Sequence, residues 1–159
     1  MSVMLGEKNR FAVEVGDPAS GLRRVDLWAA GQWLTCDDNM VFVEQFRGSV
    51  RETAASVRSG QVPSLPFADL SPVATHHRFG ATAADALRER FWFLRWGPTT
   101  DNVLAYAFHD ADQLVVTWQF WREAHFLEHP EHEGRVFEVA IETAEFVEIL
   151  DSLDSALRQ

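Results

Sequence analysis

The sequence has very little cysteine and no long apolar run, and both shortages narrow the class of protein. Among 159 residues there is one cysteine, Cys36, so an internal disulfide is impossible. Nothing around Cys36 would activate a thiolate, and we interpret it as a small buried apolar residue. No apolar run approaches the roughly 20 residues of a membrane-spanning helix, and residues 1–10 lack the apolar core of a signal peptide. We therefore expect a cytoplasmic protein that does not bind membranes.

Basic residues are scarce in the last third of the chain. Residues 101–159 contain three arginines and thirteen acids, and this imbalance accounts for the whole net charge of −10. Such a charge repels phosphate backbones, so we do not expect nucleic acid as a ligand. A basic protein is the favoured partner. The acids could also serve only to keep an aromatic protein in solution.

Catalytic and metal-binding motifs are missing as well, so we expect no cofactor. Residues 97–102 contain hydroxyls and a carboxylate, but no matched base accompanies them, and a hairpin turn is the better interpretation. Residues 123–134 contain ligand-type side chains, among them the weak metal candidates His125, His129 and His132. However, the HExxH motif would need a glutamate where Phe126 stands, and Pro130 disfavours helical geometry at His129. A hydrated hairpin loop is therefore favoured over a metal site.

What the sequence does contain is a long series of alternating apolar segments. Alternation of period two predicts half-buried strands, and seven segments show it: 10–16, 22–29, 32–36, 91–96, 103–109, 113–122 and 135–142. A spacing of three to four residues instead predicts two long amphipathic helices, at about 41–59 and 144–157. Runs of strands without strict helix alternation favour the α+β class. We predict a single domain over residues 1–159, in which both helices pack on one mostly antiparallel sheet of six to seven strands.

The outer face of that sheet is the surface most expected to bind a partner. Tryptophan is frequent at binding hot spots, and acids would attract a basic partner. The candidates on this face and on the closing helix are Trp92, Trp96, Gln119, Trp121, Glu138, Glu142, Glu145 and Glu148. Alternatively, the same face is a second small core under the 61–90 connector, or the interface of a homodimer.

Four segments also carry a resemblance to a known group of proteins. They are LWAAGQWLTCDDNMVFVEQF (27–46), LRWGPTTDN (94–102), the FWREAHF and HPEHEGRVF run (120–137) and FVEILDSLDSAL (146–157). Together they cover about half of the chain and resemble small acidic bacterial proteins, similar in style to immunity proteins of polymorphic toxin systems. This resemblance implies a protein that docks a toxin, and it assigns no role to a particular residue.

Two functions from different classes follow as hypotheses. The first is a non-enzymatic binding protein, an inhibitor whose acidic C-terminal surface docks a basic partner. The alternative is a small-molecule-binding or hydrolytic domain with a pocket between the sheet and the 61–90 connector, lined by His76, His77, His109 and tryptophans. A deep pocket with several titratable groups would favour the alternative, and a filled sheet face would favour the first.

Overall fold

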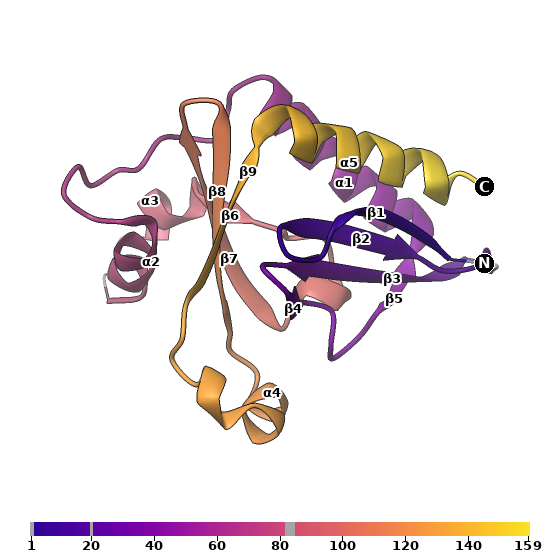
Figure 1. Cartoon of the computed structure of the whole chain (residues 1–159), viewed down its shortest axis with the longest axis horizontal. Helices are drawn as coiled ribbons and strands as arrows, with labels where there is room; N and C mark the ends of the chain where they lie inside the picture. The colour runs from indigo at the N-terminus through magenta and orange to yellow at the C-terminus, as the bar shows by residue number, and fades with distance from the viewer. Residues whose placement is uncertain (1, 20, 82–84) are drawn as a thin grey trace.

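The strands form two separate antiparallel sheets. The computed structural model describes residues 2–19, 21–81 and 85–159. The first sheet contains β1 (Val3–Glu7), β2 (Phe11–Val15), β3 (Leu22–Ala29), β4 (Gln32–Trp33) and β5 (Met40–Phe42), in the order β1-β2-β3-β4 with β5 also paired to β3. The second contains β6 (Trp92–Phe93), β7 (Val103–Asp110), β8 (Gln113–Phe120) and β9 (Phe137–Glu142), in that order. In Figure 1 the strands of one sheet run across those of the other.

The α+β class is confirmed, but the prediction of one sheet of six to seven strands is wrong. Period-two alternation reports which side chains share a face, and it does not report which strands pair. The edge of β3 that could have extended the sheet is occupied by the short strands β4 and β5. Strand β1 was not predicted, because residues 1–10 look polar and its residues are mostly exposed.

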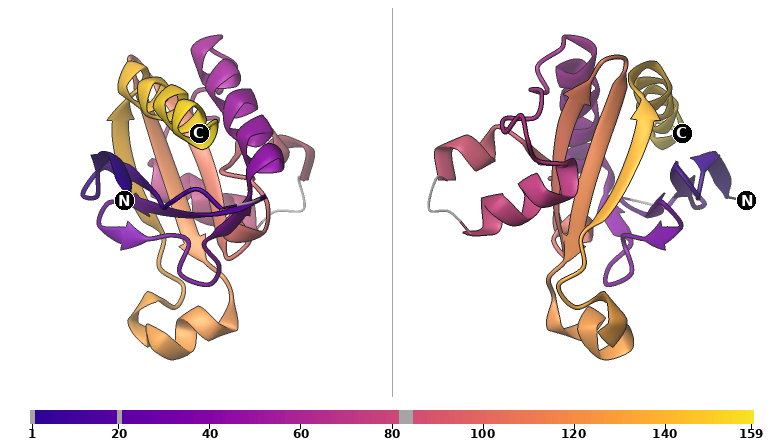
Figure 2. Two further views of the ribbon diagram at one scale, coloured as in Figure 1. Left: turned by 90° about the vertical axis from the view of Figure 1, so that its right-hand side faces the viewer. Right: turned by 60° about the vertical axis from the view of Figure 1, so that its left-hand side comes forward.

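The two long helices are confirmed within two residues at each end. They are α1 (Val43–Arg58) and α5 (Thr143–Leu157), which lie side by side along the first sheet (Figure 2). The apolar stripe of α5 faces the core, where the ring of Phe146 lies 5.0 Å from Phe11 and 5.6 Å from Phe93. One core therefore joins both sheets and both helices.

The shorter helices occupy the connectors. They are α2 (Pro72–Ala81), α3 (Asp85–Glu89) and α4 (Glu123–Glu128), with 3-10 turns η1 (Pro98–Thr100) and η2 (Pro130–His132). Helix α2 covers the face of the second sheet that points away from α1 and α5 (Figure 2). Among the described residues, no helix is long and apolar enough to cross a membrane.

The C-terminal end of α5 is fastened to β3 by a buried arginine. The Arg23 guanidinium is 5% exposed and donates hydrogen bonds to the carbonyl oxygens of Gly16 (2.9 Å) and Ala156 (2.8 Å). Carbonyls at a helix C-terminus have no partner inside the helix and carry partial negative charge, so a cation there is stabilising. This contact holds α5, and the acids on it, in a fixed position on the first sheet.

Candidate functional site

The space between the second sheet and the 61–90 connector is filled. Four buried aromatic side chains, Phe79, Phe91, Tyr106 and Phe108, form a second hydrophobic cluster there. This is the second small core that the sequence left open as an alternative. Over the described residues, the three histidines expected to line a pocket do not meet in one: His76 is buried, His77 is exposed and His109 lies at the far end of β7.

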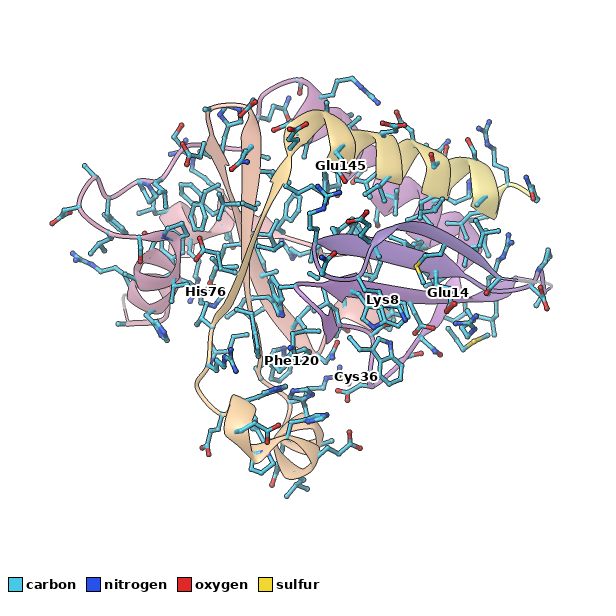
Figure 3. All side chains as sticks on the ribbon, in the orientation of Figure 1. Lys8, Glu14, Cys36, His76, Phe120 and Glu145 are labelled. Atoms are coloured by element: carbon cyan, nitrogen blue, oxygen red, sulfur yellow. The ribbon has the colours of Figure 1, made fainter. Side chains whose placement is uncertain are left out.

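His76 is a structural residue within this second core (Figure 3). Its Nδ1 lies 2.8 Å from Thr117 Oγ1, and its ring contacts Tyr106 edge-on at 4.8 Å. Burial, with a smaller contribution from the charge of His77, lowers the pKa of His76 to about 4. The imidazole is therefore neutral at pH 7, and it joins α2 to β8.

Acidification should therefore destabilise the protein through His76. Its pKa is 6.5 in the absence of these effects and about 4 in the folded chain, so the unfolded chain binds more protons as pH falls between these values. This stabilisation is present above pH 6.5 and is lost as pH falls toward 4. At about pH 4.5 the loss should be about 2 kcal/mol. Urea unfolding at neutral and acidic pH should show that His76→Gln removes this part of the pH dependence, whereas the exposed His77→Gln retains it. An unchanged dependence in His76→Gln would contradict the assignment.

Trp96 is part of the main core, so its prediction as a surface residue is wrong. Its side chain is 1% exposed, its Nε1 donates to Thr53 Oγ1 at 2.9 Å, and its ring meets Phe46 edge-on at 5.7 Å. The cause is local: Leu94 adopts a left-handed conformation with φ of 57°, which ends β6 after Phe93. Strand alternation therefore stops before Trp96, whose side chain turns inward.

Trp92 and Trp121 do come together, in a groove of about 600 Å³ at the end of β8. Trp121 is 54% exposed. The Arg95 guanidinium lies 4.0 Å from the ring centroid of Trp92, and the Arg122 guanidinium lies 5.7 Å from that of Trp121. Gln119 is adjacent, since it pairs with Leu104 of the groove wall. The predicted tryptophan surface is thus aromatic and basic, and its arginines were missed although Arg122 directly follows Trp121.

The acids of α5 fall into two groups, those paired within the molecule and those that are not. Three are paired with arginines of the first 58 residues: Glu145 with Arg10 (2.6 Å), Asp151 with Arg58 (2.7 Å) and Asp154 with Arg47 (2.9 Å). Figure 3 shows Glu145 beside the first sheet. Much of the acidity that the sequence assigned to a partner is therefore used to fasten α5 to the rest of the chain.

Glu148 belongs to the second group, and together with Glu142 at the end of β9 it lines an open groove of about 980 Å³ beside α5. Within the described part of the chain, neither carboxylate takes part in a hydrogen bond or an ion pair. Apolar side chains of β1 and α5 form the floor, including Val3, Leu5 and Val147, and Asp112 adds a further carboxylate. Glu138 is also exposed, but it pairs with Thr117 on the outer face of the sheet. The α5 groove, as we call it, can accept basic and apolar side chains.

The loop of residues 123–134 is more ordered than the sequence indicated. Pro130 does stop helix α4, as predicted, because His129 has non-helical angles (φ −132°, ψ 67°). The loop is not simply hydrated, however: His125 is 3% exposed and His132 is 9% exposed. The His125 ring stacks on Phe120 at 3.8 Å, and burial lowers the pKa of both buried histidines. Burial and the charge of Asp37 raise the pKa of the nearby Cys36 thiol to about 11, which agrees with an unreactive cysteine.

Comparison with known proteins gives a match of fold. No protein-family model and no curated protein sequence matches the chain. One solved structure, that of CdiI from Burkholderia dolosa AUO158, is similar, with a TM-score of 0.64 at 10% sequence identity. The superposition covers 97% of this chain and 99% of that chain. The chain thus shares the fold of that structure over 97% of its length.

Proposed function

We propose that this chain is an immunity protein that binds a toxin and blocks it. The observation that carries the proposal is the similarity in fold to a CdiI protein, a contact-dependent growth inhibition immunity protein, over 97% of the chain. A chance likeness of one small motif would not extend across two sheets and both long helices. The resemblance stated from the sequence points to the same class independently.

We further propose that the toxin binds in the α5 groove. Neither Glu142 nor Glu148 forms an ion pair among the described residues, and Arg58, which also lines the groove, is paired with Asp151. A basic partner can therefore bind both carboxylates without first separating them from an arginine. The apolar side chains of Val3, Leu5 and Val147 form the floor of the groove. A bound partner would remove them from water, which favours association. A toxin that cleaves nucleic acid would present a basic substrate site, and acids in the groove would compete with phosphate for it. Complementary charge would also speed the encounter.

The alternative of a small-molecule-binding or hydrolytic domain receives no support from the described residues. Its expected pocket is occupied by the second hydrophobic cluster, and its histidines are dispersed. A homodimer remains a separate prediction, which light scattering on the purified chain tests directly. The proposed site of action is the cytoplasm, where a toxin would reach its target.

Neutralisation in cells is the test of this proposal. The chain is co-expressed with candidate toxin domains taken from the reading frames that flank its own, and colony survival is counted against cells that express the toxin alone. We expect survival to be restored by several orders of magnitude, because a tight complex leaves almost no free toxin. An unrelated immunity protein is the matched control. Equal killing with and without this chain would refute the proposed function.

A further inference from the structure

The loop between β8 and β9 gathers three histidines and one glutamate at the end of the second sheet. We call this set, His125, His129, Glu131 and His132, the histidine cluster. The rings of His125, His129 and His132 lie 4.9 to 5.1 Å apart between centroids. Figure 1 shows the loop extending from the end of β8 and β9 opposite the start of α5, so the cluster is distinct from the α5 groove.

Three donor atoms of the cluster face one another on its open side. His129 Nδ1 lies 3.4 Å from Glu131 Oε1, and His132 Nε2 lies 3.9 Å from the same oxygen. All three atoms are within 4.8 Å of one another. Around a tetrahedral zinc ion with bonds of about 2.0–2.2 Å, neighbouring donors are about 3.4 Å apart. The side chains of His129 and Glu131 are 48% and 63% exposed, so they can rotate to close the remaining gap.

The buried side of the cluster holds the ring of His132 in place. His132 Nδ1 lies 2.8 Å from His125 Nε2, and His125 Nδ1 lies 3.5 Å from Cys36 Sγ. The Cys36 sulfur accepts a hydrogen bond from Asn102 Nδ2 at 3.5 Å, and it has a further lone pair that can accept from His125 Nδ1. When His125 donates from Nδ1, its Nε2 accepts from His132 Nδ1. In that arrangement the lone pair of His132 is on Nε2, on the side of His129 and Glu131.

This arrangement matches the way in which proteins support metal-binding histidines. A ligating histidine usually donates its other ring N–H to a neighbouring acceptor, which fixes the orientation of the ring. Here His125 Nε2 is in position to be that acceptor, and the His125 ring is itself held by stacking on Phe120, which Figure 3 labels. The one buried ligand is therefore fixed in position, while the two exposed ligands are free to adjust.

We propose that His129 Nδ1, Glu131 Oε1 and His132 Nε2 form a binding site for a divalent transition metal ion, with His125 as a positioning residue. Two imidazoles and one carboxylate favour zinc, nickel or copper over calcium or magnesium, which prefer oxygen ligands alone. Three protein ligands leave a coordination position for water or for a side chain of a partner. A bound ion would fix η2 against α4 and so stiffen the loop.

Zinc titration tests the site on the full chain, produced without a histidine tag and freed of metal by chelation. Calorimetry should show one zinc ion bound per chain, and the midpoint of thermal unfolding should rise with zinc concentration. His129→Ala and Glu131→Gln should each weaken zinc binding by about 10-fold or more. Both side chains are exposed, so these variants should fold like the wild type. The matched controls are His77→Ala and Glu133→Gln, which change exposed residues outside the cluster and should bind zinc as the wild type does.

Two results would overturn the proposal. One is the absence of zinc binding at about 100 µM zinc. A site that stays empty at this concentration has a binding free energy weaker than about −5.5 kcal/mol. The other is binding by His129→Ala and Glu131→Gln that equals binding by the controls, since the ion would then sit elsewhere. Neither result bears on toxin neutralisation, so this site and the proposed function can fail separately.

Discussion

The double substitution Glu142→Lys/Glu148→Lys should weaken binding of the toxin domain by about 100-fold. Both carboxylates line the α5 groove, and neither is engaged with another group of the described chain. Reversing the charge at both positions therefore removes two attractions to a basic partner and introduces two repulsions. The association rate should fall most at low salt, because screening at about 0.1 M reduces attraction beyond about 10 Å. Surface plasmon resonance at two salt concentrations measures both the affinity and the rate.

A control with the same change in net charge separates the groove from the general field of the protein. Asp69→Lys/Glu89→Lys alters two exposed acids in the 61–90 connector, away from α5. We expect this variant to bind the toxin within a few-fold of wild type. If both double variants lose affinity equally, the overall charge matters and the α5 groove does not. Thermal unfolding of each variant checks the fold, since Glu142 adjoins the N-terminus of α5, where a cation is unfavourable.

Asp26→Ala should lower the free energy of unfolding by about 3 kcal/mol. Asp26 lies on β3, is 4% exposed and accepts hydrogen bonds from several side chains. Its Oδ1 accepts from Trp33 Nε1 (2.9 Å), Thr35 Oγ1 (3.1 Å) and Asn39 Nδ2 (3.0 Å), and its Oδ2 accepts from the Arg24 guanidinium. Alanine would leave these donors without their acceptor, and Thr35, which is 1% exposed, is the least able to bond to water instead.

Guanidinium chloride unfolding measures this effect, and two variants provide controls. Asp26→Asn keeps one oxygen acceptor and should lose less stability than alanine. Glu14→Ala removes the other carboxylate that binds Arg24, at 3.1 Å, but its side chain is 24% exposed. A partly exposed pair of this kind contributes at most about 1 kcal/mol. Equal losses for Asp26→Ala and Glu14→Ala would mean that Asp26 has no organising role in the first sheet.

Periodicity in the sequence predicted those elements whose side chains are divided regularly between two faces. Strands β7, β8 and β9 follow the alternation of residues 103–109, 113–122 and 135–142 closely, and the buried residues of α1 and α5 recur at the spacing of three to four residues that predicted both helices. In these segments local pattern and tertiary packing agree. The pairing of strands into two sheets depends on contacts between distant segments, which periodicity does not encode.

The candidate surfaces were harder to predict because local backbone geometry decides them. One left-handed residue, Leu94, moves Trp96 from the surface to the core. Strand β1 brings Val3 and Leu5 to the α5 groove from a segment that looked like a polar terminus. Glu145, which composition alone counted as available, is paired with Arg10. The histidine cluster depends on the 3-10 turn after Pro130, which curls the chain so that His132 meets His125.

The affinity of the purified chain for the toxin domain that it neutralises in cells tests the central claim most directly. An immunity protein must hold its toxin at cellular concentrations, so we predict a Kd in the nanomolar range, about −12 kcal/mol. Calorimetry at about 0.15 M salt, an ionic strength that screens long-range attraction, should give one toxin per chain. Absence of binding at micromolar concentrations of both proteins would contradict the account.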